Sequence, residues 1–344
     1  MKIKKTFWFF LFLFIGLSLF IREIFNTGFE NIFQALKDFS LLKFLIFVAI
    51  SFVNFSLFSW RWQLVVKQIH KGKKIKPTAF FMDRMAGYAV SYVTPMAQLG
   101  GEPLRLMLIQ EEGVSRKTAI SSTIIEKALE LSTLILFISA GILITLIEPW
   151  LPLETKIPLA IVGAVMLFAV IWFYVTSYTQ IGFLSSIFNL FKLNKFKRLR
   201  KYCHKMNKFE KEMNAFYQNH TGTMNLLILI SLITVVFILI EHFLVAYFLG
   251  VKLTFLETFL ISTIPYIAYM LPVPAGLGAL ESGAALIFLI LGVEINAFAF
   301  IFIIRLRDFI FVSMGLVRGS QKAFSIMKKE FQEDFNLKHN SKSN

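Results

Sequence analysis

Arginine, tyrosine and glutamate side chains recur at helical spacing in a chain that is otherwise strongly apolar. Arg84 and Tyr88 are four residues apart, and Arg105 follows Glu102 by three. Residues at these spacings share one face of a helix. A guanidinium forks onto two oxygens of a phosphate group, so arginine suits an anionic ligand. Arg84, Tyr88 and Arg105 are therefore predicted to bind an anionic group.

A second set of charges follows at Glu126, Lys127 and Glu130. The two glutamates are four residues apart, where like charges on a helix repel each other. We therefore expect a cation such as Arg84 or Arg105 to lie opposite them, or one carboxyl group to be protonated. Charge balance or proton coupling is the role predicted for the set Glu102, Glu126, Lys127, Glu130 and Glu281.

The second half of the chain also carries ionisable residues inside apolar stretches. A charge at mid-bilayer costs about 2.5–3.5 kcal/mol on insertion scales, so such residues face the protein interior and pair, or serve function. Arg305 is predicted to join the ligand-binding arginines, with an internal salt bridge as the alternative. The pairs Arg307–Asp308 and Glu241–His242 are expected to lie nearer span ends or to be purely structural.

The elements that must hold these side chains are membrane helices. Of 344 residues, 56% are hydrophobic and forty are phenylalanine, which is typical of membrane proteins and excludes the soluble classes. An apolar run of about 20 residues spans the bilayer core as a helix. The sequence predicts an all-α polytopic membrane protein, a single transmembrane domain over 1–344, with six spans at 6–25, 41–60, 118–147, 157–177, 224–249 and 295–317. No small-residue cleavage site follows 6–25, so it is interpreted as a retained span and not as a signal peptide.

Lysine and arginine mark one side of the predicted bundle. The formal net charge is +15 at pH 7, and cations cluster before the first span, at 61–76, at 192–211 and after the last span. Cytoplasmic loops concentrate Lys and Arg, so both termini are predicted to lie in the cytoplasm and the protein in the cytoplasmic membrane. This topology requires 77–112 to enter and leave from the inside and 254–293 from the outside. Each is therefore predicted to be a hairpin, either re-entrant or fully crossing.

The loop at 178–223 carries nine Lys/Arg between 192 and 211. Its apolar residues recur every three or four positions from Leu193 to Phe216, which predicts an amphipathic helix on anionic headgroups. We favour this interpretation over RNA binding because basic loops are the norm beside spans, and no nucleic-acid partner is predicted. The segment 318–344 is predicted to be a cytoplasmic tail.

Landmarks coincide when the chain is shifted by 179 residues. Pro95 meets Pro274, and Glu102 meets Glu281. Both blocks also share the order span, span, hairpin, span, in opposite orientations. Two inverted halves around interrupted helices are typical of transporters. The predicted halves are 1–147 and 157–317.

Proline and glycine break both hairpins. Pro95 is predicted to end one half-helix, and Gly100 and Gly101 to let the chain turn and begin the next. In the second hairpin the corresponding residues are Pro272, Pro274, Gly276 and Gly278, followed by Glu281. The N-terminus of a half-helix favours an anion, so the four glycines are included in the predicted binding set. The alternative is that Glu102 and Glu281 only cap these N-termini.

No sequence pattern indicates a cofactor or a metal. The five histidines are scattered, and no His, Cys or carboxylate group has metal-ligand spacing. No P-loop, G-x-S-x-G or kinase signature occurs. The single Cys203 excludes an internal disulfide. The chain is therefore expected not to be an enzyme.

A resemblance to a known family extends over nearly the whole chain. The stretches YVTPMAQLGGEPLRLML, GVSRKTAISSTIIEKALE and LPVPAGLGALE resemble the membrane region of lysylphosphatidylglycerol synthases, whose stand-alone relatives are called flippase-like. Lys127 stands where the family pattern usually has arginine, and lysine cannot donate in a fork. The synthases carry a large soluble C-terminal domain, whereas this chain ends about 27 residues after the last predicted span, so aminoacyl transfer is expected to be absent. The resemblance implies one hairpin motif of Arg84, Pro95, Gly100, Gly101, Glu102 and Arg105 and a second of Pro274, Gly276, Gly278 and Glu281.

Together these features predict a flippase-like transporter of an anionic lipid, which is a phospholipid or a polyprenyl-phosphate-linked carrier. Two alternatives stay open. One is a membrane-embedded transferase that acts on a lipid phosphate, for which the sequence offers no recognisable donor site. The other is a non-transport scaffold of envelope synthesis that uses the basic loop. A homo-oligomer is compatible with all three.

Overall fold

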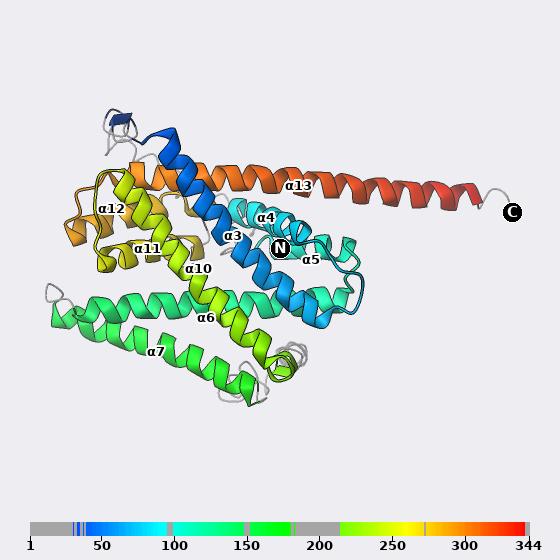
Figure 1. The fold of residues 1–344 in the computed structure, drawn as a ribbon, viewed down its shortest axis with the longest axis horizontal. Coiled ribbons are helices and arrows are strands. Elements are labelled where there is room, and N and C mark those ends of the chain that lie inside the picture. The colour runs from blue at the N-terminus through cyan, green and yellow to red at the C-terminus, as the bar shows by residue number, and fades with distance from the viewer. Residues whose placement is uncertain are drawn as a thin grey trace, which may run out of the picture.

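The computed structural model describes residues 39–94, 99–147, 152–179, 214–271 and 273–340, together with a few positions between 30 and 37 and Gly182; side chains are described up to residue 321. Within these ranges the chain is all-helical and contains no strand. Figure 1 shows the helices gathered into one bundle, with the end of α13 projecting from it. The predicted span 6–25 and most of the predicted amphipathic helix of the basic loop lie outside the described residues.

The elements follow the predicted order of spans and hairpins. They are α3 (Leu41–Ile69), α4 (Pro77–Val93), α5 (Glu102–Glu111), α6 (Arg116–Ile147), α7 (Leu153–Tyr178), α10 (Thr221–Phe248), α11 (Phe255–Met270), the 3₁₀ turn η2 (Pro274–Gly276), α12 (Ala279–Leu291) and α13 (Ala297–Asn340).

Five helical segments of the described chain are long and apolar enough to cross a bilayer. The prediction of an all-α multi-pass membrane protein is thereby confirmed. The predicted span 295–317 is helical within α13, but it holds Arg305, Arg307 and Asp308 and is not among the five. The five segments are Leu41–Ile69, Arg116–Leu146, Lys156–Tyr178, Thr221–Phe248 and Pro274–Leu291.

Two helices run beyond the predicted ends of their spans. The second span was expected to end at residue 60, but α3 continues to Ile69 and takes Arg61 into the bundle. The last span was expected to end at residue 317, but α13 continues to Asn340 through most of the predicted tail. A charged residue can stay within a helix when a partner inside the protein pairs with it.

Both predicted hairpins are pairs of short helices. α4 ends at Val93, before Thr94 in an extended conformation, and α5 begins at Glu102. α11 ends at Met270, and α12 begins at Ala279 after η2. The sequence therefore located both interruptions to within a few residues.

The glycines at the two interruptions serve different purposes. A Cβ on Gly101 would lie 1.8 Å from the carbonyl oxygen of Gly87, so α4 and α5 touch backbone to backbone. Gly101 itself has an ordinary φ of −87°, so a left-handed conformation is not what requires glycine there. In the second hairpin, Gly276 and Gly278 do have positive φ, as does Ala275 at 55°.

The helix bounds repeat at the same offset as the sequence landmarks. Shifted by 179 residues, α3 would span 220–248, and α10 spans Thr221–Phe248. α5 would span 281–290, and α12 spans Ala279–Leu291. Figure 1 shows that α3 and α10 run in opposite directions, as do α6 and α13. These are the relative directions that an inverted repeat requires.

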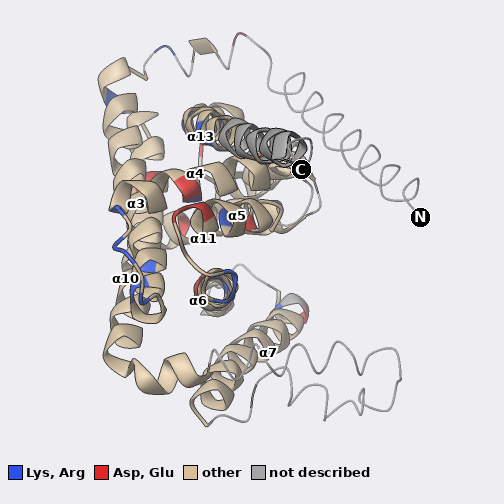
Figure 2. Cartoon of the chain, turned by 90° about the vertical axis from the view of Figure 1, so that its right-hand side faces the viewer, with Lys and Arg blue, Asp and Glu red and all other residues tan. Residues whose placement is uncertain are grey.

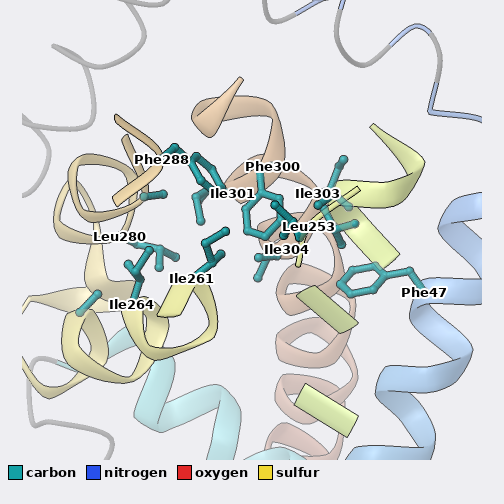
Figure 3. Packing of buried hydrophobic residues seen from close by; sticks show 14 of the residues in the cluster. Phe47, Leu253, Ile261, Ile264, Leu280, Phe288, Phe300, Ile301, Ile303 and Ile304 are labelled. Atoms are coloured by element: carbon teal, nitrogen blue, oxygen red, sulfur yellow. The ribbon is translucent and has the colours of Figure 1, made fainter. Parts of the chain in front are cut away.

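The largest hydrophobic cluster fixes the second hairpin against α13. Ile261 and Ile264 of α11, Leu280 of α12, and Ile301 and Ile304 of α13 are buried together. Figure 3 shows them side by side with Phe47 of α3 and Leu253. This packing sets the position of the charged residues that follow on α13.

Candidate functional site

Glu126 of α6 lies at the centre of a buried charge cluster. Its Oε1 accepts hydrogen bonds from Arg61 Nη2 at 2.8 Å and Arg84 Nη1 at 2.7 Å, and its Oε2 accepts from Arg105 Nη2 at 3.1 Å. Glu126 and Arg61 are completely excluded from solvent. Three guanidinium groups from α3, α4 and α5 therefore converge on one carboxylate.

Two further carboxylates complete this first cluster. Glu130 accepts from Arg84 at 3.1 Å and from Lys127 Nζ at 2.9 Å. Glu102 lies 2.9 Å from Arg105 and 3.4 Å from Lys127. Lys127 thus joins two carboxylates as a point charge, which needs no fork. With every group ionised, four cations face three carboxylates, and the cluster has a net charge of +1.

Aromatic rings shield these guanidinium groups. Arg61 and Arg84 both lie over the ring of Phe58, at 5.2 Å from its centroid. Arg105 lies over Trp62 at 4.3 Å. Cation–π contacts of this kind stabilise a desolvated cation by about 2 kcal/mol. The rings therefore help to hold the cations away from water.

The expectation that Arg84 and Arg105 lie opposite the glutamates of α6 is confirmed by these contacts. Arg61 was missed, because it was assigned to a cytoplasmic loop after the second span. Its neighbours Trp60 and Trp62 and the apolar residues beyond them were a signal that the helix continues. Figure 2 shows acidic residues inside the bundle around α4 and α5, and Lys and Arg in the loop that follows α3.

A second cluster joins α10 and α13. Arg307 donates to Glu241 Oε2 and to Asp308 Oδ1, the latter at 2.8 Å from Nη2. Asn54 Nδ2 donates to Glu241 Oε1 at 3.1 Å, and the Tyr269 hydroxyl donates to Asp308 Oδ2 at 2.9 Å. Asn54, Glu241 and Asp308 are buried, and Arg307 is partly exposed.

The two clusters use the same pair of helices in each half with the charges reversed. In the first half, α3 supplies Arg61 and α6 supplies Glu126. In the second half, α10 supplies Glu241 and α13 supplies Arg307. Asp308 adds a second carboxylate beside the single guanidinium of Arg307, so the second cluster has a net negative charge.

Arg305 occupies a third location, between the tips of the two hairpins. It donates to Glu281 Oε1, to the Tyr92 hydroxyl at 3.2 Å and to the carbonyl oxygen of Ala275 at 3.2 Å. Glu281 also accepts from the backbone N–H of Gly278 at 2.9 Å. The expectation that Glu281 caps its half-helix is thus confirmed, whereas Glu102, in the first turn of α5, bonds to Arg105.

One cavity of about 210 Å³ connects the first cluster to the second. It lies between the hairpins and the long helices, and aromatic and aliphatic side chains line it together with both clusters. We call the part that the first cluster lines the basic end and the part that the second cluster lines the acidic end. Arg305 and Glu281 are not among its lining residues. The lining residues that carry a charge or a hydrogen-bonding group include Asn54, Arg61, Arg84, Tyr88, Glu102, Arg105, Lys127, Glu130, Glu241, His242, Tyr266, Tyr269, Arg307 and Asp308.

The predicted glycines and Pro274 belong to the hairpins. A small pocket between the hairpin tips is lined by Tyr92, Tyr269 and Gly276, so the two hairpins are adjacent. Gly100, Gly101 and Gly278 shape the backbone of the hairpins without lining the large cavity. Pro274 begins η2, while Pro95 and Pro272 lie outside the described residues. No group of three or more His, Cys, Asp or Glu among the described residues could hold a metal ion.

The chain was compared with known proteins. No curated protein matches the chain. The family model described as the lysylphosphatidylglycerol synthase TM region matches residues 7–314. That range includes both hairpins, both charge clusters and the cavity between them. The chain therefore belongs to the family of lysylphosphatidylglycerol synthase transmembrane regions.

Proposed function

We propose that this protein moves a lipid with an anionic headgroup, a phospholipid or a polyprenyl-phosphate-linked carrier, across the cytoplasmic membrane. The observation that carries the proposal is the net charge of +1 at one end of the cavity between the helices. Three arginines and a lysine there exceed the three carboxylates by one. A charge excess inside a membrane protein is costly, and a phosphate group bound beside this cluster would balance it locally.

The first cluster supplies both recognition and charge balance in this proposal. Arg84, Arg105 and Lys127 line the cavity and would contact the phosphate. Glu126 accepts hydrogen bonds from Arg61, Arg84 and Arg105, and its negative charge offsets the repulsion among the three guanidinium groups. Pre-positioned donors of this kind bind phosphate well because little ordering is required at the moment of binding.

The two hairpins supply the route to either side. We propose that they are re-entrant, that the halves form an inverted repeat and that both termini are cytoplasmic. The matched helix bounds and the opposite directions of α3 and α10 support this topology. In transporters with inverted repeats, rocking of one repeat against the other exposes a central site to each side in turn.

Reconstitution into liposomes tests the proposal. Fluorescent phosphatidylglycerol in the inner leaflet should reach the outer leaflet faster with the wild-type protein than with Arg105→Gln, in which the cavity loses one positive charge. Equal rates for the wild type, the variant and empty liposomes would contradict it. A lipid recovered with an altered covalent structure would instead support the transferase alternative.

A further inference from the structure

The acidic end of the cavity has one carboxylate more than it has cations. Glu241 and Asp308 are 3% and 0% exposed, and both bond to Arg307. Among the described residues that line the cavity, the neighbouring hydrogen-bonding groups are neutral. They are Ser51 and Asn54 of α3, Tyr88 of α4, His242 of α10, and Tyr266 and Tyr269 of α11, while the first cluster faces this end from across the cavity.

A net negative charge at this position is unfavourable. Two carboxylates that share a site cannot easily both be ionised, because each opposes the charge of the other. Arg307 compensates for only one of them. Burial within a membrane protein increases the cost, since water cannot solvate the second charge. The excess cation of the first cluster lies across the cavity, so a positive charge at the acidic end itself would stabilise the pair locally.

Two acceptor atoms at this end have no donor. Asn54 Oδ1 and His242 Nε2 are buried without a hydrogen-bond partner among the described residues. His242 Nδ1 lies 2.8 Å from the carbonyl oxygen of Ile238, which can only accept, so Nδ1 donates and Nε2 has a free lone pair. Asn54 already contacts Glu241 through its amide nitrogen. Turning that amide over would present Oδ1 to an O–H group on Glu241.

A proton fits this place better than a metal ion does. Each of the four carboxylate oxygens of Glu241 and Asp308 already accepts a hydrogen bond from Asn54, Tyr269 or Arg307. A metal ion would need several of these oxygens at once as ligands. A proton needs one lone pair on a carboxylate and one acceptor nearby. Both are present.

We propose that Glu241 and Asp308 together hold one exchangeable proton and that this pair is the proton-coupling site of the transporter; the coupling role rests on the proposed function. The proton is taken from water, forms an O–H bond with one carboxylate and converts it to a neutral carboxylic acid. Arg307 then balances the other carboxylate. Release of the proton to water restores the second negative charge.

The two ends of the cavity then set the stoichiometry. The first cluster contributes +1, the deprotonated acidic end contributes −1, and a phosphodiester headgroup adds −1. One proton makes the loaded cavity neutral. The coupling site is thus placed on Glu241 and Asp308, two carboxylates that share one cation. The sequence suggested Glu102, Glu126, Glu130 and Glu281, which lie in groups with at least as many cations as carboxylates.

Infrared difference spectroscopy of the purified protein in phosphatidylcholine nanodiscs tests the proton site without any transport. Between neutral and alkaline pH, the wild type should lose a carboxylic-acid C=O band. Glu241→Gln and Asp308→Asn, which preserve side-chain shape, should remove or shift that band. Glu281→Gln, next to Arg305 and outside the cavity, is the matched control and should leave it unchanged.

A wild-type protein without this band at neutral pH would overturn the proposal, even if the variants failed to fold. So would a band that persists unchanged in both variants. In liposomes, a pH gradient should alter the rate of phosphatidylglycerol transport by the wild type and have no effect with Glu241→Gln. The proposal would also be overturned if the pH gradient did not change the rate of transport by the wild type. The same holds if transport required a lipid whose ammonium group fills the acidic end. A clear band without any lipid transport would leave the proton site standing and reject the proposed function.

Discussion

The Arg61 guanidinium on α3 lies 2.8 Å from the Glu126 carboxylate on α6, and neither side chain is exposed to solvent. Removal of one partner from such a buried pair leaves an uncompensated charge and typically costs about 3–5 kcal/mol. Glu126→Gln removes the partner of three arginines at once, so it should lower the thermal stability of the detergent-solubilised protein strongly. Arg61→Met should cost less, because Arg84 and Arg105 still contact Glu126. Equal melting temperatures for both variants and the wild type would contradict this interpretation of the cluster.

Gly101 tests the close contact within the first hairpin. Gly101→Ala would place a methyl group 1.8 Å from the Gly87 carbonyl oxygen, so α4 and α5 must separate. Overpacking of this kind costs about 1–3 kcal/mol. Gly222→Ala is the matched control, since its Cβ would meet nothing within 4 Å. We expect a lower melting temperature for the first variant and an unchanged or slightly higher one for the second.

Lys127 tests the charge excess of the first cluster. Lys127→Met would reduce its net charge from +1 to zero while leaving the three arginines in place. Affinity for phosphatidylglycerol in nanodiscs should fall by about tenfold, which corresponds to about 1.4 kcal/mol. Lys127→Arg retains the charge and should bind as the wild type does. A Met variant that binds the lipid unchanged would show that charge excess is not what attracts it.

Arg105 and Arg305 should differ in their effects on lipid binding. Arg105 lines the large cavity, whereas Arg305 bonds to Glu281, Tyr92 and Ala275 between the hairpin tips. Arg105→Gln should weaken equilibrium binding of phosphatidylglycerol. Arg305→Gln should lower the melting temperature but change that affinity by less than about twofold, a few tenths of a kcal/mol. The reverse pattern would place the ligand at the hairpin tips.

Ala275 tests the backbone strain of the second hairpin. Its φ of 55° lies in the left-handed region, which costs a residue with a Cβ about 1–2 kcal/mol. Ala275→Gly should therefore raise the melting temperature or leave it unchanged, because the lost strain offsets the greater freedom of the unfolded chain. Ala275→Val should lower it clearly, since β-branched residues tolerate positive φ poorly. A stable Val variant would contradict the argument.

The sequence predicted the fold class and the two interruptions because these depend on local chemistry. Apolar runs of bilayer length, prolines and paired glycines can each be recognised within a short stretch of sequence. The contacts of Arg84 and Arg105 with the glutamates of α6 were also predictable, because two acids on one helical face require a cation.

The rest of the site could not be predicted, because it depends on tertiary contacts. Arg61 looked like the first residue of a basic loop, and only the position of α6 shows that Glu126 pairs with it. The bond between Glu241 and Arg307 joins residues 66 positions apart. The close contact that requires glycine at position 101 was not predictable either, because it is made with Gly87 on the neighbouring helix.

The size of the cavity has a consequence for selectivity. About 210 Å³ is less than the roughly 300–1,000 Å³ of pockets that enclose a whole drug-sized ligand, so it has room for a polar headgroup but not for two fatty-acyl tails. Under the proposed function the tails would stay in the surrounding hydrocarbon throughout the crossing. Tail length and unsaturation should then matter little, and the protein would discriminate among lipids by their polar ends alone.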